Sequence, residues 1–574
     1  MNNKKFSILY PDNGAKFKKL SDVAVHDLGM DIICKRVSMK EQEQNLIMGI
    51  ISNMSDDPYV TKYRCDIFDD ILKNKSMREE LMSILDKINF LREYGSSKHN
   101  MDSEIGTWDL LHQLEEIRDY IKCIEAIYSC LENADLHSDG LLGLKKYVSD
   151  LYNDNGFKEL KEDIANLKCD TSNLKSVTVG INLNNRFEAE SIGLISVNSK
   201  QFTKSNLIGN FCDRFSTKDN IKDTLEWKDN YRYNQLSESD AATFNKVLNK
   251  SAVNTMVANS SATTLGIIGV IEGSGTEGVT HYMDRITNRL LSHTVKNLRD
   301  VLKKYTTLTI TNITDLMPEF TYYIRWAEYI ENLQKQGAKF AKATVIQELG
   351  ESNDNARTMH AKGIYNLKLA AIATKEHEEI ITNDIDFTDE HRVYILTGAN
   401  RGGKTTITQA VGQLYLLAQG GIYIPGDSFE FAPVDGIYTH FPADEDQTMD
   451  LGRLGEECKR FREIYKEATN KSLMLLNETF STTSFEEGYY IAKDSVRAIM
   501  QKGISTVYNT HMHKLARDID EMNAEPCKDK AVSLVTKSDE GKRSYKVVIC
   551  PPSGKSYAKD IAEKYGVTYE MLVE

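Results

Sequence analysis

The chain has 574 residues, of which 41% are hydrophobic and 27% are charged, a composition typical of folded, core-forming proteins. Its formal net charge of −13 excludes a globally basic coat for nucleic acid, although a local basic patch could still contact phosphates. The sequence has no apolar run of roughly 18 residues, no secretory signal and no CxxC pair among its nine cysteines, so we expect a cytoplasmic protein with reduced thiols and no membrane-spanning helix.

The first part of the chain has the pattern of long amphipathic helices. Between residues 23 and 170, Leu, Ile and aromatic residues recur every three or four positions, as in 79–94 and 108–130, which predicts helices that bury one face. The sequence contains only nine prolines, and because proline interrupts helix interiors, this scarcity suits long helices. We expect another helix at 321–337.

A small β element and a polar stretch interrupt these helices. The runs SVTVGINL (176–183) and ESIGLISV (190–197) predict two strands around the turn-like pair Asn184–Asn185. Residues 200–280 are polar and then rich in Ser, Thr and Gly, which indicates loop or flexible backbone. Helical periodicity returns at 281–305, where apolar residues occupy one stripe and basic residues largely occupy another.

After about residue 340 the pattern changes to short strands and glycine turns that alternate with helices, which is typical of an α/β domain. The predicted fold is therefore multidomain. A helical region with a small β element covers 1–340, and an α/β domain with a phosphate-binding loop covers 341–574.

The phosphate-binding loop lies in RVYILTGANRGGKTT, residues 392–406. Residues 398–405 match the G-x-x-x-x-G-K-[ST] pattern without a mismatch, between an apolar run and a helical pattern. Glycines leave room for backbone N–H groups around a phosphate, and the following helix directs its positive end at the anion. Lys404 is expected to reach the β- and γ-phosphates, and Thr405 to help hold Mg²⁺. The sequence thus predicts binding of ATP or GTP.

A phosphate loop needs a neighbouring strand that ends in polar residues near Mg²⁺ and the attacking water. The best candidate is SLMLLNE at 472–478, although an ordinary buried strand with a polar end has the same pattern. Glu478 is suited to orienting or deprotonating a water, whereas Asn477 brings an amide oxygen without charge where a metal-side Asp is expected. Another strand at 503–508 leads to His511, which could sense the γ-phosphate or be structural.

Taken together, these motifs resemble the MutS mismatch-repair family, whose ATPase domain is of the ABC type. The family's TGPNMGGKST is similar to TGANRGGKTT at 397–406, and its SLVLMDEIGRGTSTYDG is similar to SLMLLNETFSTTSFEEG at 472–488. Its ATHYFEL and SKSYG are similar to NTHMHKL at 509–515 and GKSY at 554–557. The order and spacing agree across roughly 392–574, whereas the helical half resembles the family's core and lever region more weakly.

The resemblance implies an ATP-dependent, DNA-binding protein that works as a homodimer paired through its ATPase domains. Hydrolysis of ATP to ADP and phosphate would control a clamp for double-stranded or branched DNA, with a clamp-like insertion at about 171–280. The implied nucleotide-binding residues are Gly398, Asn400, Gly402, Gly403, Lys404, Thr405 and Thr406. The implied Mg²⁺ site comprises Thr405, Asn477 and Glu478, and the implied catalytic residues are Glu478 and His511.

The same resemblance makes the helix at 281–305 the candidate DNA-binding face. Its contacts would be mainly to phosphates and selective for shape. The alternative is that its basic residues form a solvated surface beside a core stripe. These residues are Arg285, Arg289, Lys296, Arg299 and Lys303.

The chain departs from the family pattern in ways that bear on function. It begins at the core region, so we expect no N-terminal mismatch-reading domain and recognition of DNA structure rather than of mismatches. It ends soon after Tyr557, so we expect no C-terminal dimerising extension. Asn477 replaces the family's Asp, which predicts weaker Mg²⁺ binding and leaves the rate of hydrolysis open.

The signature segment, which in this family approaches the γ-phosphate of the opposite subunit, also differs. Aligned from Glu478, the family's STF falls on 452–454, which reads Gly-Arg-Leu, while Glu457 matches the family's Glu. Arg453 could substitute for the missing Ser as a charged donor. Where the family has an aromatic ring to stack on adenine, the chain has aliphatic packing from Ile380 or Ile381.

These changes and the acidic net charge keep a second hypothesis open. The chain could be a slow or inactive ATP-gated scaffold that binds a protein or an RNA-containing partner. The two hypotheses differ in whether DNA changes the rate of ATP hydrolysis.

Overall fold

The computed structural model describes residues 6–84, 107–166, 176–183, 185, 189–198, 316–346, 357–376, 379–399, 402–442, 452–539, 542–552 and 566–573. The chain divides into two compact units. The first comprises Met1–Asp86, Ile127–Ser149 and Thr311–Glu574, and the second comprises Lys87–Ala126 and Asp150–Ile310.

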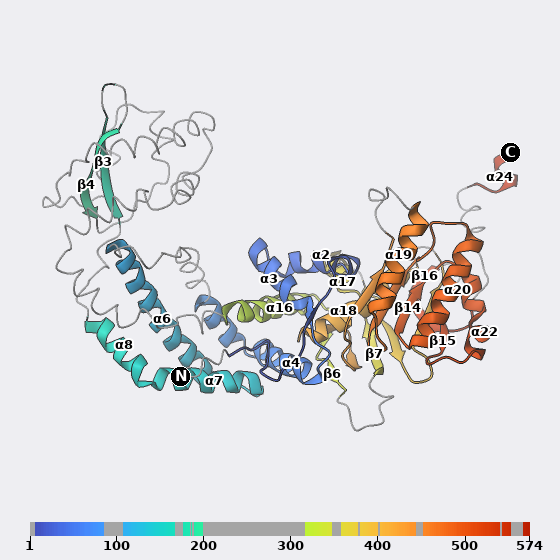
Figure 1. Cartoon of the computed structure of the whole chain (residues 1–574), viewed down its shortest axis with the longest axis horizontal. Helices are drawn as coiled ribbons and strands as arrows, with labels where there is room; N and C mark the ends of the chain where they lie inside the picture. Colours follow the sequence, from blue (N-terminus) through green and yellow to red (C-terminus); the bar gives the residue numbers. More distant parts are fainter. Residues whose placement is uncertain are drawn as a thin grey trace. The chain divides into compact units, whose positions relative to one another are not determined.

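The second unit holds the small β element that the sequence predicts. Strands β3 (Ser176–Leu183) and β4 (Ala189–Asn198) pair antiparallel (Figure 1), which confirms both predicted strands. Helix α8 (Asn155–Asn166) belongs to the same unit. The stretch at 200–280 and the helix predicted at 281–305 lie outside the described residues, and with them the candidate DNA-binding residues Arg285, Arg289, Lys296, Arg299 and Lys303.

The helices predicted before residue 340 are largely present. Helix α6 (Thr107–Asn133) covers the helix predicted at 108–130, and α16 (Met317–Lys335) begins four residues before the helix predicted at 321–337, with a proline in its first turn. The helix predicted at 79–94 is described, and helical, only as far as residue 84. The other helices in this part are α1 (Asp22–Asp27), α2 (Met30–Val37), α3 (Glu41–Ile51), α4 (Pro58–Lys73) and α7 (Asp139–Asn153).

A six-stranded sheet lies at the centre of the α/β part of the first unit. Its strand order is β12-β13-β14-β9-β15-β16, and all neighbours run parallel except the antiparallel edge pair β15 and β16. β9, β12, β13 and β14 are buried along their whole length, as expected of parallel strands covered on both faces. In sheet order the strands are Ile437–His440, Leu473–Asn477, Ser505–Asn509, Val393–Thr397, Ala531–Asp539 and Lys542–Ile549.

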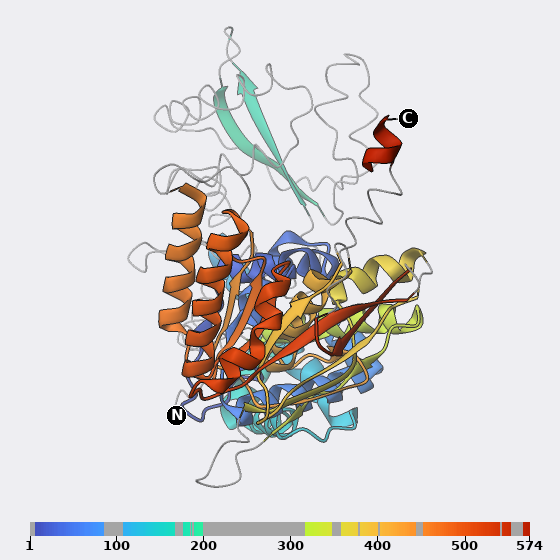
Figure 2. The same ribbon diagram turned by 90° about the vertical axis from the view of Figure 1, so that its right-hand side faces the viewer.

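Helices cover both faces of this sheet (Figures 1 and 2). Helix α18 (Lys404–Gln419) lies on one face, where Gly412 approaches Leu475 so closely that a Cβ would lie 2.7 Å from the leucine Cδ1. Helix α20 (Phe485–Lys502) lies on the other face, where Val496 shares a buried cluster with Met474 and Leu476. Successive residues of β13 therefore face opposite helices, as the two-residue period of a strand requires.

A smaller four-stranded sheet has the order β6-β11-β7-β8, and helix α17 (Leu367–Glu376) follows β7. Its strands are Thr344–Val345, Ser428–Phe431, Met359–Ile364 and Asn383–Phe387. The remaining elements are β1 (Lys18–Lys19), β2 (Asn53–Met54), β5 (Phe340–Ala341), β10 (Ile424–Pro425), α19 (Gly452–Glu467), α21 (His513–Arg517), α22 (Ile519–Ala524) and α24 (Tyr569–Val573). Among the described residues, no helix has the length and apolar composition needed to cross a bilayer.

Helix α18 also packs against helices from the first part of the chain. Gln413 Nε2 donates to Leu28 O at 2.8 Å, and Tyr322 of α16 donates its hydroxyl hydrogen to Gly420 O at 2.9 Å. These contacts place helices from before residue 340 in the same compact unit as the α/β part. No change of compact unit marks the boundary expected near residue 340, which stays a prediction.

Arg64 of α4 is fully buried and closes the C-terminal end of α18. Its Nη1 donates to Gln419 O at 3.0 Å and its Nε to Leu9 O at 2.8 Å. Gly421 lies against Arg64 with φ +83°, and a Cβ there would be 2.4 Å from Arg64 Cβ. Both the backbone conformation and the contact therefore require glycine at this position.

Replacing Gly421 by alanine should destabilise the first unit by more than the cost of placing alanine in a left-handed backbone conformation. Gly337→Ala is the matched control, because Gly337 has φ +95° but open space around its Cβ position. We expect Gly337→Ala to lower the free energy of unfolding by about 1–2 kcal/mol. Gly421→Ala should lose roughly 1–3 kcal/mol more, because it overpacks the contact with Arg64. Urea denaturation measures the free energy of unfolding of both variants. Equal decreases would contradict the prediction, because they would show that the structure around Arg64 accommodates the added Cβ without a loss of stability.

Candidate functional site

The glycine-rich loop joins β9 to α18, because β9 ends at Thr397 and α18 begins at Lys404. Gly398 has φ +142°, and a Cβ on it would lie 2.0 Å from Thr536 Oγ1. A Cβ on Gly402 would lie 2.8 Å from Ala399 O. The close approach of the neighbouring backbone and of β15 therefore requires the glycines that the pattern contains. Asn400, which the resemblance assigns to nucleotide binding, lies outside the described residues.

Lys404 is the first residue of α18 and is 95% shielded from solvent, with a relative exposure of 5%. Its Nζ donates to Gly398 O and Ala399 O, both at 3.2 Å. Burial lowers the pKa of this ammonium group, and the negative charge of Glu478 partly opposes that change. An ammonium group that is held by neutral carbonyls at a helix N-terminus is suited to receive an anion.

Three polar side chains meet beside the lysine. Thr405 Oγ1 donates to Asn477 Oδ1 at 3.0 Å, and Asn509 Nδ2 donates to the same Asn477 oxygen and to Thr405 Oγ1, the latter at 3.3 Å. Asn477 and Asn509 are register partners at the carboxyl ends of the parallel strands β13 and β14. The fold therefore brings together two of the three predicted Mg²⁺ residues, Thr405 and Asn477, and adds Asn509.

Glu478 and His511 form an ion pair at the same edge of the sheet, with 2.6 Å between Glu478 Oε1 and His511 Nε2. The hydrogen bond from His511 lowers the pKa of Glu478, partial burial opposes this change, and the charges of His511 and Lys404 add to the lowering. Glu478 is thus held as a carboxylate beside the loop. Its backbone has φ +51°, and its N–H donates to Asn509 O at 2.8 Å.

The segment after Glu478 is held by α19, the helix that begins at the predicted signature position. The side chain of Thr482 donates to Glu457 Oε2 of α19 at 2.9 Å. His440 on β12 lies 3.1 Å from Thr479 Oγ1 and 3.2 Å from Glu457 O, and burial lowers its pKa to about 4, so this imidazole is neutral at pH 7. Glu457 therefore orders the segment that carries Glu478, while Arg453 lies exposed in the first turn of α19.

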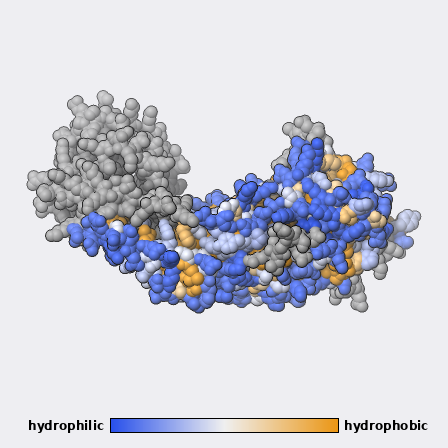
Figure 3. All heavy atoms as spheres, turned by 60° about the horizontal axis from the view of Figure 1, so that its bottom comes forward, coloured by the Kyte–Doolittle hydropathy of each residue, from blue (hydrophilic) through white to orange (hydrophobic). Residues whose placement is uncertain are grey.

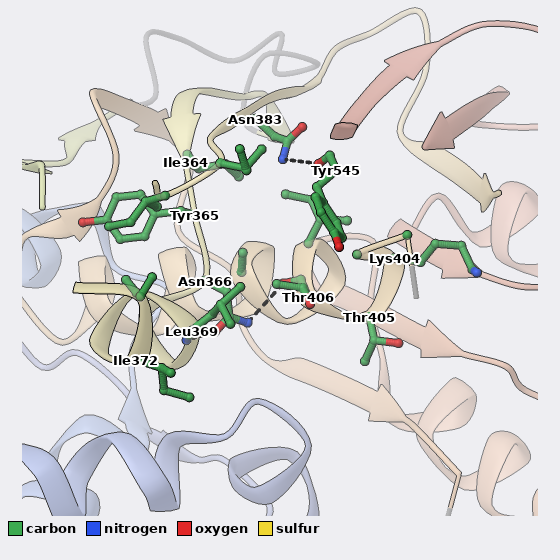
Figure 4. Close-up of a pocket in the computed structure, with 18 of the residues that line it drawn as sticks. Ile364, Tyr365, Asn366, Leu369, Ile372, Asn383, Lys404, Thr405, Thr406 and Tyr545 are labelled. Atoms are coloured by element: carbon green, nitrogen blue, oxygen red, sulfur yellow. Dashed lines mark hydrogen bonds between the residues drawn. The ribbon is translucent and has the colours of Figure 1, made fainter. Parts of the chain in front are cut away.

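A cavity of about 690 Å³ opens beside the loop and is lined by Gly402, Gly403, Lys404, Thr405 and Thr406, and by Glu478 and His511. Its apolar wall comes from α17 and the segments around it, at Ile364, Leu369, Ala370, Ile372, Ala373, Ile380 and Ile381. Figure 4 labels Ile364, Leu369 and Ile372 of this wall. A cavity of this size, with an apolar wall and a few polar groups at one end, is typical of small-molecule sites.

Tyr545 of β16 closes the cavity over the glycine loop. A Cβ on Gly403 would lie 3.4 Å from its Cδ1, and Asn383 fixes the strand by donating Nδ2 to Tyr545 O at 3.1 Å and accepting from Val547 N at 2.8 Å. Figure 4 shows the bond between Asn383 and Tyr545, and a second bond, 3.1 Å long, from Asn366 Nδ2 to Thr406 O.

The structure thus assembles the described candidate residues of the nucleotide site at one edge of the sheet, but it also contains residues that the sequence did not indicate. Tyr545, Asn366 and Asn509 belong to segments far apart in the chain, and none lies in a phosphate-binding motif. Of these three residues, only Asn509 could have been noticed in the sequence, because it replaces the Ala that begins the family's ATHYFEL motif.

Family models match both parts of the chain. The model of MutS domain V matches residues 394–574, and the model of the MutS2 N-terminal domain matches residues 56–336. The chain belongs to the MutS family. MutS domain V is the ATPase domain of this family, so residues 394–574, which include the glycine loop and α18, match the family's ATPase domain.

Curated MutS-family relatives align with only part of the chain. Endonuclease MutS2 of Caldicellulosiruptor bescii is 27% identical over 303 residues, which are 52% of this chain and 37% of that protein. DNA mismatch repair protein MutS of Thermus thermophilus is 30% identical over 194 residues, 33% of this chain and 23% of that protein. DNA mismatch repair protein MutS 2 of Halobacterium salinarum is 28% identical over 200 residues, 34% and 22% of the two chains. The chain therefore spans less than two fifths of the length of these relatives.

Proposed function

We propose that this MutS-family chain binds ATP with Mg²⁺ beside the glycine loop, hydrolyses it to ADP and phosphate, and uses the bound nucleotide to control its grip on double-stranded or branched DNA. One observation carries the proposal. A buried Lys404 starts the helix after the loop, and Glu478, which directly follows β13, lines the same cavity with its carboxylate. This arrangement supplies a phosphate cradle and a group for the attacking water at one site.

The residues present fit a nucleotide-bound Mg²⁺ ion. Mg²⁺ keeps several waters and takes one or two protein oxygens together with substrate phosphates. Thr405, which lines the cavity, supplies a hydroxyl oxygen, and Asn477 supplies an amide oxygen 3.0 Å from it. When bound, the ion would neutralise phosphate charge. Asn477 adds no charge of its own, so its contribution to holding the ion is smaller than that of a carboxylate.

Glu478 is the residue that we assign to the water. Its lowered pKa keeps it ionised at neutral pH, so it can accept a hydrogen bond from water and orient it toward the γ-phosphorus. Attack by the oxygen of this water would form the new P–O bond while the bond to the β-phosphate oxygen breaks, the proton of the water would pass to Glu478, and ADP and phosphate would leave. His511, 2.6 Å from Glu478, holds the carboxylate in place.

The apolar wall of the cavity is suited to a nucleobase. Leu369 and Ile372 of α17, with Ile380 and Ile381, provide aliphatic contact, and Tyr545 provides an aromatic ring near the phosphate loop. We therefore assign the base to this wall. The sequence predicted only aliphatic packing against the base, from Ile380 or Ile381. Tyr545, which is far from these residues in the chain, adds an aromatic ring to this wall.

Our proposals of DNA binding and dimerisation are based on the chain's membership of the MutS family. The relatives are named as mismatch-repair and endonuclease proteins, and we carry over DNA binding and a homodimer paired through the ATPase domains. We carry over no nuclease step, because the alignment with the endonuclease spans 37% of that protein. The second candidate, a slow ATP-gated scaffold for a protein or RNA-containing partner, is favoured by the uncharged Asn477.

Two substitutions separate nucleotide binding from turnover. Glu478→Gln should keep ATP affinity within about threefold but lower turnover at least 100-fold, because it removes the carboxylate that orients the water. Lys404→Ala should weaken ATP binding roughly 10- to 100-fold, because it removes charge-assisted bonds to the phosphates. Equilibrium binding and phosphate release measure these effects, with exposed Glu390→Gln as the control. Normal hydrolysis by Glu478→Gln would remove Glu478 from the mechanism.

DNA should change the rate of ATP hydrolysis. At fixed salt, we expect turnover to differ at least severalfold between no DNA, linear duplex, mismatched duplex and a four-way junction. DNA affinity should fall steeply with salt, because phosphate contacts release counterions. The DNA function would be rejected if no DNA substrate changed the rate of ATP hydrolysis and DNA binding were absent or independent of salt. This result would favour the second hypothesis, the ATP-gated scaffold.

Tyr545→Ala should weaken ATP binding about three- to tenfold with little change in turnover, because one aromatic contact with a base contributes about 0.5–1.5 kcal/mol. Tyr545→Phe should retain the affinity, because it keeps the ring. Tyr490→Ala, at an exposed position on α20, is the control. Titration with a fluorescent ATP analogue measures all three. If Tyr545→Ala binds as tightly as Tyr490→Ala, the base lies elsewhere.

A further inference from the structure

The metal side of the site contains two asparagines, Asn477 and Asn509, where one acidic residue would be enough. Both are buried, with relative exposures of 7% and 0%. They are register partners on adjacent parallel strands, so both side chains meet Thr405 from the same edge of the sheet. This pairing raises the question of what the second amide does.

A carboxylate and an amide differ in symmetry. Either oxygen of a carboxylate can accept the hydroxyl hydrogen of Thr405, whereas an amide has one acceptor end and one donor end. If Asn477 turned its NH₂ group toward Thr405, this group would donate to the hydroxyl oxygen and occupy a lone pair that a cation needs. A neutral residue at this position therefore works only if its orientation is fixed.

Asn509 supplies that orientation. Its Nδ2 donates to Asn477 Oδ1 and, at 3.3 Å, to Thr405 Oγ1, so the oxygen of Asn477 must face both neighbours. Thr405 then donates its own hydrogen to Asn477 Oδ1, at 3.0 Å, and accepts from Asn509, so one of its two lone pairs remains unused.

The other end of the Asn509 amide is left unpaired by this orientation, and the opposite flip of the amide is worse. Asn509 Oδ1 is buried and has no hydrogen-bond partner among the described residues. An unpaired buried carbonyl costs free energy, and such groups are rare enough that each one calls for an explanation. The opposite flip would place this oxygen against Asn477 Oδ1, with two acceptors facing each other.

We propose that Asn509 is a positioning residue, which fixes Asn477 with its oxygen toward Thr405 and so leaves the Thr405 hydroxyl able to bind the nucleotide's Mg²⁺. The inference rests on the proposed function. It makes Asn509 necessary only while residue 477 is an asparagine, because a carboxylate at 477 needs no fixed orientation.

A double-mutant cycle tests this dependence without measuring turnover. The probe is mant-AMPPNP, a fluorescent non-hydrolysable ATP analogue, and the measured quantity is the ratio of its affinities in saturating MgCl₂ and in EDTA. We expect Asn509→Ala to lower this ratio about tenfold, equivalent to about 1.4 kcal/mol. In the Asn477→Asp background, Asn509→Ala should change the ratio by less than about twofold.

The controls separate positioning from folding. Asn523→Ala removes another partly buried asparagine, whose amide bonds both the N–H and the C=O of Ala531, and it should leave the ratio unchanged. Should Asn509→Ala fail to fold, Asn509→Ser replaces it, because a serine hydroxyl is too short to span the distance to Asn477 and should cause the same loss.

Equal losses in both backgrounds would overturn the proposal, since they would make Asn509 merely structural. An unchanged ratio in the single Asn509 variants would overturn it as well. If the unaltered protein binds the probe neither with Mg²⁺ nor without it, the proposed function itself fails. Binding in EDTA that survives in every variant leaves the nucleotide site standing and confines any failure to Asn509.

Discussion

Helix α18 is buried along nearly its whole length, so its polar groups need hydrogen-bond partners within the protein. This requirement is the constraint on which the rest of the first unit depends. A helix in this position must place every polar group on a partner, because an unpaired buried polar group is costly. The amides of Gln409, Gln413 and Gln419 donate to backbone carbonyls of residues 27, 28 and 55. Arg64 holds the C-terminal end, and the glycine loop leads into Lys404 at the other. The helices before residue 340 therefore help to fix where the loop lies.

Backbone strain gathers at the same site. Among the described residues, the non-glycine residues with positive φ are Glu478, Phe480 and Tyr545. Two of them line the cavity, and the third follows Glu478 by two positions. Such conformations cost about 1–3 kcal/mol each and persist where surrounding bonds hold them. Glu457 and Asn509 hold the segment at Glu478, and Asn383 holds Tyr545, so the packing of the domain maintains these two strained backbone positions in the lining of one cavity.

The sequence indicated those parts of the site that follow from local patterns. An apolar run before glycines predicted β9 and α18, and four apolar residues before Asn477 and Glu478 predicted β13. Parallel strands bring their carboxyl ends to one edge of the sheet, so the proximity of Glu478 and His511 could also be predicted from the sequence. Tyr545 and Asn366 could not, because their positions depend on how β16 and α17 pack across the domain. The start of α16 at Met317 was missed for a local reason, since its first turn carries the proline that weakens a periodicity argument.

The charge distribution at this site separates holding a nucleotide from cleaving it. The contacts expected to hold phosphate are the loop, the helix N-terminus and Lys404, and none of them depends on residue 477. In the proposed mechanism the cation and the attacking water act on the transition state, and Glu478 is the carboxylate that we assign to the water. Interactions that are equally strong in the ground state and the transition state raise affinity without raising turnover. If the proposed function holds, a neutral asparagine pair beside this loop slows hydrolysis more than it weakens ATP binding, so the protein stays long in its ATP-bound state.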